Sequence, residues 1–133
     1  MNYKNGMKEG AWVSYHENGQ LWLKGSHNSS KREGAWVSYH DNGQLSYKGN
    51  YNNDKIEGSW TEYHKNGQLW LKGNYKNDER EGAWVMYHMN GQLMSKGNYK
   101  NDKRDGAWVS YNEDGTVDKE LTRTYKDGVK ISD

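Results

Sequence analysis

The stretch GAWVSYHENGQL, residues 10–21, decides the fold, because close copies of it begin at Gly34, Gly58, Gly82 and Gly106. Tryptophan recurs every 24 residues, at positions 12, 36, 60, 84 and 108. A fixed period of this length indicates stacked units that bury their apolar surfaces against one another. We therefore predict one repeat domain over residues 1–133. Its units are about 10–33, 34–57, 58–81, 82–105 and 106–133, after a partial N-terminal unit, 1–9.

Each unit has the pattern of a β-hairpin. GAWVSYH is rich in strand-forming residues and too short for a helix, and the Asn-Gly that follows is a strong hairpin signal. A second strand such as LWLKGNY comes next, followed by a polar link. The predicted fold class is all-β: an elongated single-layer antiparallel meander of about five stacked hairpins, with strands ~4.8 Å apart.

The register of each hairpin depends on its turn. We predict a three-residue turn over residues 17–19, with Gly19 left-handed, in preference to a two-residue Asn-Gly turn. This register segregates side chains best, and a one-residue slip would exchange the faces. One face would hold Ala11, Val13, Tyr15, Leu21, Leu23 and Gly25. The other would hold Trp12, Ser14, His16, Gln20, Trp22 and Lys24, with Lys24, Lys48, Lys72 and Lys96 available for cation–π contacts with tryptophan.

The composition limits the class of protein. The net charge of +1, from 19 basic and 18 acidic residues, argues against strong non-specific nucleic-acid binding. Without cysteine there is no disulfide framework or thiol nucleophile. Only 32% of residues are apolar, yet there are 7 Trp and 11 Tyr, which favours a thin core repeated along an axis. No signal-peptide pattern or long apolar run is visible, so we expect a cytoplasmic protein.

Two repeated polar columns could suggest chemistry. His16, His40, His64 and His88 recur once per unit, about 9.6 Å apart in the predicted sheet. Zinc needs its nitrogen ligands ~2 Å from one centre, so we interpret these histidines as polar positions at the mouth of each hairpin. We interpret Glu33, Glu57, Glu81 and Asp105 as turn charges. No position breaks the repeat with catalytic chemistry, so we expect no enzyme, no metal and no cofactor.

The pattern G-x-W-x-x-Y-x-x-N-G-x-L-x-x-x-G-x-Y resembles the MORN repeat variant of many bacterial proteins. It is carried by Gly58, Trp60, Tyr63, Asn66, Gly67, Leu69, Gly73 and Tyr75, and by the matching residues of the other units. The resemblance implies an elongated, twisted antiparallel sheet of stacked hairpins. Similar proteins are often labelled antitoxins, and others are scaffolds or lipid-proximal modules. The departures are Asp54, Asp78 and Asp102, where glycine is usual in the second turn, and a degenerate fifth unit.

These observations lead to a functional hypothesis. We expect a non-enzymatic module that binds and neutralises a protein partner, a toxin or an effector enzyme. It would act as an antitoxin, an immunity protein or an inhibitor, for example of a host-defence nuclease. The alternatives are a module for a glycan or membrane surface and a structural scaffold. We expect no direct contact with nucleic acid and no membrane association.

Positions that vary between otherwise equal units are candidates for partner recognition. In the predicted register they lie opposite each other on the tryptophan face: Ser14 with Trp22, Ser38 with Ser46, Glu62 with Trp70, and Met86 with Met94. The predicted centre of the site is Glu62, Trp70, Met86 and Met94, flanked by Trp22, Trp60 and Trp84. The alternative is that variable positions are merely exposed, since Leu23, Tyr47, Leu71 and Ser95 vary as well.

Overall fold

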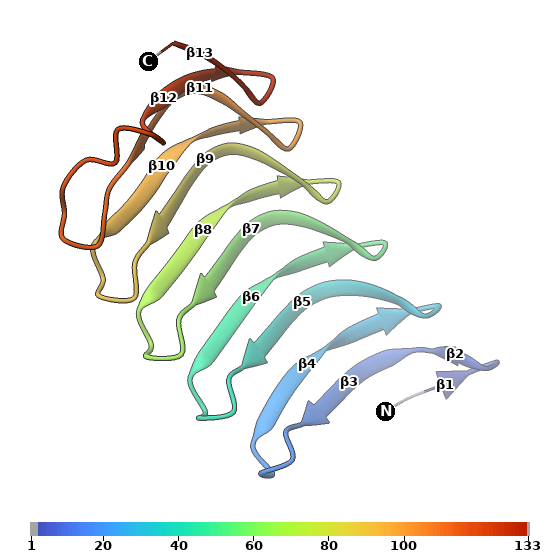
Figure 1. Ribbon diagram of the computed structural model, residues 1–133. Helices are drawn as coiled ribbons and strands as arrows, with labels where there is room; N and C mark the ends of the chain where they lie inside the picture. The colour runs from blue at the N-terminus through green and yellow to red at the C-terminus, as the bar shows by residue number, and fades with distance from the viewer. Residues whose placement is uncertain (1–2, 133) are drawn as a thin grey trace.

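The computed structural model describes residues 3–132, with side chains to residue 129, and consists of strands and turns (Figure 1). Each strand of the main sheet is antiparallel to its neighbour in the chain, in the order β13 to β3. The predicted all-β meander is confirmed. Its strands are β3 Gly10–Tyr15, β4 Leu21–Asn28, β5 Lys31–Tyr39, β6 Leu45–Asn52, β7 Lys55–Tyr63, β8 Leu69–Lys76, β9 Glu79–Tyr87, β10 Leu93–Lys100, β11 Lys103–Ser110, β12 Arg123–Lys126 and β13 Val129–Ser132.

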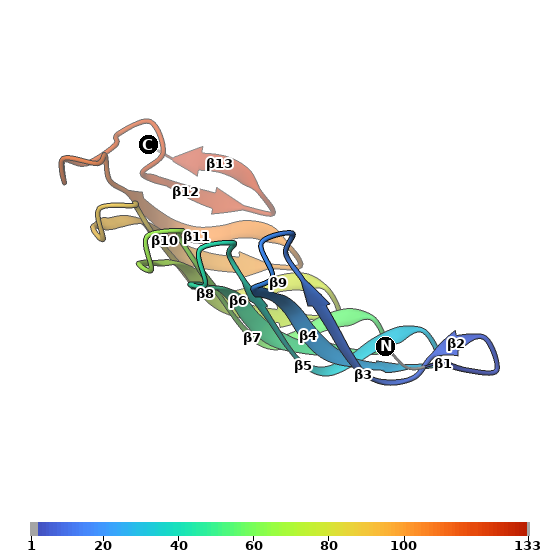
Figure 2. The same ribbon diagram turned by 90° about the horizontal axis from the view of Figure 1, so that it is seen from below.

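The sheet is a single bent layer, as the view from below shows (Figure 2). The first unit adds a short hairpin of β1 (Tyr3–Lys4) and β2 (Met7–Lys8), which forms a separate two-stranded sheet. In the described part of the chain, no helix is long and apolar enough to cross a membrane.

The Asn-Gly turns have the predicted three-residue form. Gly19 has a φ of 89°, and its N–H donates to the carbonyl of His16 over 2.9 Å. The N–H of His16 donates in turn to the carbonyl of Gln20, also over 2.9 Å. This closes a type I turn followed by a left-handed residue. The side chain of Asn18 supports the turn, because its Oδ1 accepts from the N–H of Gln20 at 3.0 Å.

The predicted faces are wrong beyond the first pair after the turn. Tyr15 pairs with Leu21 as predicted, but Ser14 pairs with Leu23, so Trp22 is an extra residue in a second bulge. The same bulge recurs between Met86 and Tyr87 on β9 and their partners on β10. Beyond the bulge, the strands pair in the register that places Trp12 opposite Gly25. Gly25 and Leu23 thus share the face of Trp12, here called the aromatic face. The opposite face, here called the lysine face, carries Ala11, Val13, Lys24, Ser26 and their equivalents.

The core lies on the aromatic face, where four of the seven tryptophans, one in each unit after the first, cover a glycine. A Cβ atom on Gly73 would collide with the ring of Trp84, and the same holds for the pairs Gly25–Trp36, Gly49–Trp60 and Gly97–Trp108. These four tryptophans are only 2–5% exposed. Their rings contact the tyrosine or histidine of the neighbouring strands edge to face, for example Trp84 and Tyr75 with centroids 5.1 Å apart. Such contacts contribute beyond the buried area alone.

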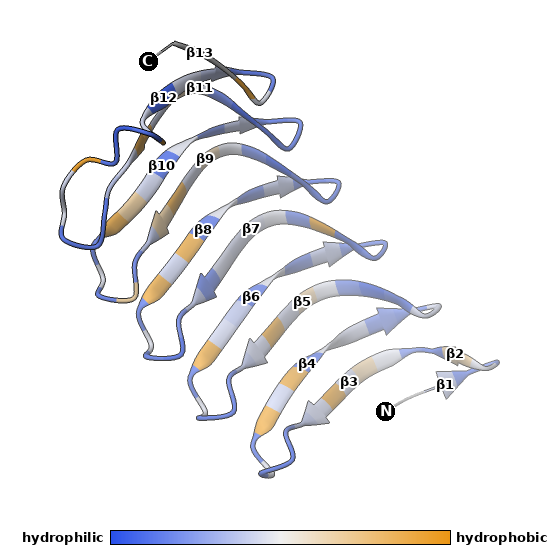
Figure 3. Ribbon diagram, viewed as in Figure 1, coloured by the Kyte–Doolittle hydropathy of each residue, from blue (hydrophilic) through white to orange (hydrophobic). Residues whose placement is uncertain are grey.

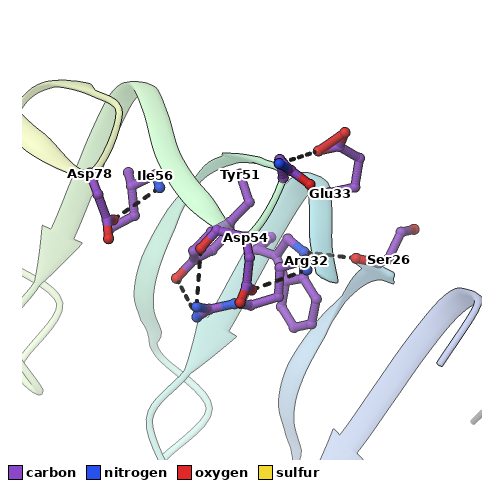
Figure 4. A network of polar contacts seen from close by, with 9 residues as sticks. Ser26, Arg32, Glu33, Tyr51, Asp54, Ile56 and Asp78 are labelled. Carbon is purple, nitrogen blue, oxygen red and sulfur yellow. Dashed lines mark hydrogen bonds and ion pairs between the residues drawn. The ribbon is translucent and has the colours of Figure 1, made fainter. Parts of the chain in front are cut away.

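In the second turn of a unit, the structure shows why aspartate stands where glycine is usual in the family pattern. Asp54 has a φ of 71°, and its Oδ1 accepts from Arg32 Nε, in the preceding hairpin, over 2.6 Å. The Arg32 guanidinium also lies 4.2 Å from the centroid of the Tyr51 ring and donates to its hydroxyl (Figure 4). Hydrogen bonding to Arg32 holds the pKa of the Asp54 carboxyl below its ordinary value. The aspartate therefore adopts the left-handed conformation of this turn and also bonds to the preceding hairpin, which a glycine could not do because it has no side chain.

The C-terminal unit departs from the repeat after its turn. Tyr111 still pairs with Val117 in an isolated bridge, but the chain then leaves the sheet. It returns as β12, which pairs with β11 only at Gly106, Ala107 and Trp108. Meanwhile Thr122 Oγ1 accepts a hydrogen bond from the N–H of Ser110 over 3.0 Å. The degenerate fifth unit thus produces a loop whose Thr122 lies against Ser110 at the end of β11.

Candidate functional site

The variable positions form one continuous row across the aromatic face. Leu71 pairs with Glu62 on one side and with Met86 on the other. Tyr47 pairs with Glu62, and Met86 pairs with Ser95. The predicted cross-strand pairs Ser14–Trp22, Ser38–Ser46, Glu62–Trp70 and Met86–Met94 are therefore wrong, because the bulge replaces the second residue of each pair by its successor. The residues expected on the opposite face, Leu23, Tyr47, Leu71 and Ser95, complete this row instead.

The tryptophans of the predicted site belong to two classes. Trp60 and Trp84 are 5% and 4% exposed, so a partner could touch little of either ring. They support the surface from within the core, and their part in partner binding stays a prediction. Trp22 and Trp70 occupy the second bulge and are 47% and 40% exposed. Each contacts the histidine at the hairpin mouth, with ring centroids 5.3 Å apart for Trp70 and His64.

Glu62 breaks the repeat. In the units around Trp36, Trp84 and Trp108 the indole Nε1 donates to a backbone carbonyl, as Trp84 does to Asn74 over 3.1 Å. Trp60 instead donates to Glu62 Oε1 over 3.2 Å. The ring of Tyr47 stacks on the indole of Trp60, with ring centroids 4.9 Å apart. Burial raises the pKa of the Tyr47 hydroxyl. The centre of the variable row therefore carries a half-buried carboxylate fixed by an indole.

The apolar side chains gather toward the Asn-Gly turns. Figure 3 shows hydrophobic segments recurring as a band in the half of the strands nearer these turns. Met86 and Met94 are half-buried in this half of their strands, with Met86 packed against the cluster of Trp84 and Trp108. Of the predicted site residues, the structure thus brings Glu62 and Met86 together across Leu71. It places Trp22, Trp70 and Met94 beside the row, in the bulges.

The histidine column braces the hairpins. His16 Nε2 lies 2.7 Å from the carbonyl of Tyr39 in the next unit, and His64 Nε2 lies 2.8 Å from that of Tyr87. Because a carbonyl can only accept, these nitrogens carry the proton and donate. Among the residues that the structure describes, no group of histidine, cysteine and acidic side chains could hold a metal ion.

The glutamates before the repeated glycine stabilise the second turns. Glu33 Oε2 accepts from the N–H of Asn53 over 2.8 Å, and Glu81 Oε2 accepts from that of Asn101 over 3.0 Å. The sequence placed these carboxylates in turns but did not show which donors they meet. Their partners lie one turn further along the stack, which only the pairing of hairpins brings close.

A second surface was missed from the sequence. On the lysine face two open hollows of about 840 and 750 Å³ adjoin at Ser59. They are lined by alanine, valine, glycine, asparagine and tryptophan together with Lys24, Lys48, Lys72 and Lys96. These lysines do not lie over the tryptophans, so the expected cation–π role is wrong. Among the described residues, the cations that lie over aromatic rings are those of Lys8, Arg32, Arg80 and Arg104.

The repeat pattern, the glycine under each tryptophan and the paired hairpins agree with one family model. The model of the MORN repeat variant matches residues 8–28, 32–53, 56–77, 80–101 and 104–127. The chain belongs to the MORN repeat variant family. MORN repeats are generally protein- or membrane-binding modules.

Other comparisons add little to this assignment. No curated protein sequence matches the chain. Among solved structures, a chain of the "GtfA/B complex bound to UDP and GlcNAc" is similar over 80% of this MORN repeat chain, with 12% identity and a TM-score of 0.29. The match spans 21% of the length of that chain. A similarity this low does not bear on the binding partner.

Proposed function

We propose that this MORN repeat chain is a non-enzymatic module that binds a protein partner through its aromatic face and neutralises the partner by covering it. The observation that carries the proposal is the exposure of Trp22 and Trp70. The fold does not require tryptophan in the bulge, because Ser46 and Met94 occupy the same position in other units. Large aromatic side chains that are exposed without a structural need are typical anchors of protein interfaces.

The surroundings of these tryptophans fit a protein interface. Trp22 and Trp70 lie two units apart, about 19 Å at four strand spacings. The half-buried Glu62 and Met86 lie in the variable row beside them, where they offer a fixed acceptor and an adaptable apolar side chain. Such a mixture of anchors and adaptable contacts supports a partner of globular shape better than it supports a regular polymer.

The test is capture of the partner from cells that naturally express the chain, with the native chain and a Trp22→Ala, Trp70→Ala variant compared side by side. We expect the variant to lose the partner while it keeps its circular dichroism spectrum and melting temperature. The matched control is Tyr15→Ala, because Tyr15 is 63% exposed and, one residue after Ser14, turns to the opposite face of the sheet from the variable row. Equal capture by the native chain and the tryptophan variant would contradict the proposal.

Neutralisation requires a separate measurement. The captured partner is expressed alone and together with the MORN repeat chain, and its activity or its effect on growth is recorded. We expect inhibition that requires a stoichiometric amount of the chain and is lost with Trp70→Ala. A partner that binds but stays fully active would leave only a scaffold function, and catalytic turnover by the chain itself would refute the non-enzymatic assignment.

A further inference from the structure

The lysine face carries a groove that runs along the stack of hairpins. Its lining includes alanine, valine and glycine together with Trp12, Trp36, Trp84 and Trp108, and Ser59 joins its two hollows. One lysine per unit lines it: Lys24, Lys48, Lys72 and Lys96, all exposed. The hairpins repeat in similar orientation along the stack (Figure 1), so these lysines form a row parallel to its long axis.

The lining of the groove carries four lysines and no acidic side chain. Glu33 and Glu81 share the lysine face, but their carboxylates accept from turn amides at the far end of the strands. Among the described residues, the ion pairs involve Arg32, Lys65 and Arg80, and none involves a lysine of the row. Four ammonium groups therefore remain for a ligand.

The spacing of this row selects the shape of the ligand. Successive lysines are separated by two strands, or about 9.6 Å. A polyproline II segment rises ~3.1 Å per residue and completes a turn in three residues, or about 9.3 Å. One side chain in every three thus meets one lysine, and the exposed amides of Asn50, Asn74 and Asn98 lie in the same groove to bond the segment's free backbone groups.

We propose that the groove binds an extended acidic peptide segment with a carboxylate at every third residue. Trp22 and Trp70 line neither hollow, so the proposal does not depend on the tryptophan site. A flat membrane would reward a dense basic cluster rather than a single row sunk beside a groove. Because the chain's net charge of +1 gives little general attraction to an anion, binding of an acidic segment must depend on this local row of lysines.

The test measures the fluorescence anisotropy of a labelled peptide of four Glu-Pro-Pro repeats. We expect saturable binding to the native chain, which weakens as salt is raised because exposed ion pairs are screened. A peptide of equal charge with glutamate at every second residue should bind several-fold more weakly. The quadruple variant Lys24→Gln, Lys48→Gln, Lys72→Gln, Lys96→Gln should bind about 30-fold more weakly, since each exposed pair contributes roughly two- to threefold.

The matched control removes four positive charges outside the groove: Lys4→Gln, Lys65→Gln, Lys119→Gln and Lys126→Gln. None of these residues lines either hollow. We expect this control to bind almost as well as the native chain. The reciprocal variant, with the four groove lysines changed to glutamate, should instead bind a Lys-Pro-Pro peptide, which shows that loss of binding does not reflect misfolding.

Several results would overturn the proposal. One is the absence of binding to any of the acidic peptides by the native chain. Another is equal weakening by the groove variant and the control, which would indicate a general charge effect. Indifference to the spacing of glutamate would refute the polyproline II geometry. Tighter binding of vesicles with anionic lipid or of a sulfated polysaccharide, through the same four lysines, would assign the groove to that ligand and not to a peptide.

Discussion

Substituting Gly73 by alanine is the sharpest test of how this sheet is held together. The backbone of Gly73 is not left-handed, so alanine causes no strain of its own there. Its Cβ would nevertheless collide with three ring atoms of Trp84. The ring is 4% exposed and cannot move outward without giving up its contacts with Tyr75 and Tyr99.

The size of the effect follows from this geometry. Overpacking a core costs typically 1–3 kcal/mol, and a collision with a rigid ring belongs at about 3 kcal/mol. Complete loss of the tryptophan contacts, roughly 3–5 kcal/mol, sets the upper limit. For a chain of this length, an unfolding entropy of about 0.3 kcal/mol per kelvin converts 3 kcal/mol to a fall of about 10 °C in Tm.

The assay is thermal and urea unfolding followed by tryptophan fluorescence, arranged as a double-mutant cycle with Trp84→Leu. If the collision is the cause, Gly73→Ala should cost little once the indole is gone, with a coupling of about 2 kcal/mol. Two controls separate other effects. Asn74→Ala removes an exposed side chain but keeps the carbonyl that accepts from Trp84, and Gly82→Ala adds only the strain of a φ of 75°. A cost for Gly73→Ala below about 0.5 kcal/mol, or equal costs in both backgrounds, would refute the reasoning.

Three further predictions concern single side chains. Burial, with the charge of Lys8, lowers the pKa of His27 below its ordinary 6.5. Because the unfolded chain therefore binds the proton more readily, the free energy of unfolding should fall as pH drops below 6.5. Unfolding curves at pH 5 and 7.5 should show that His27→Tyr reduces this loss. Arg80→Ile should cost under about 1 kcal/mol, because its ion pair is exposed and Ile56 fills the same position in the second unit, residues 34–57. A cost above 2 kcal/mol in urea unfolding would contradict this. Trp70→Ala should weaken partner binding by ~2 kcal/mol in titration calorimetry, with Tm almost unchanged.

Much of the fold could be predicted because its determinants are local. The Asn-Gly turn required a left-handed Gly19, and a turn of known length sets the first strand pair. The 24-residue period then implied that every unit makes the same contacts with the next. The assignment of His16 and its equivalents to a polar position at the hairpin mouth likewise needed only their spacing.

The candidate site was harder to predict because it depends on one residue per unit that leaves the regular alternation. Trp22 reads in the sequence as an ordinary strand residue, yet it is the extra residue of a bulge. That bulge reverses the face of everything beyond it, including Leu23 and Gly25. A glycine opposite a tryptophan was a usable signal, since a bulky ring needs a partner without a Cβ.

The sequence by itself determined the repeat, the hairpin, the three-residue turn and the family. These follow from short-range turn chemistry and from a period that repeats five times. Only the tertiary structure decided which face holds the tryptophans, which of them remain exposed, and where the lysines lie. The physical reason is that the faces depend on the packing of each indole over the glycine of the neighbouring hairpin. That contact favours the bulged register over the simpler alternation that sequence pattern alone would select.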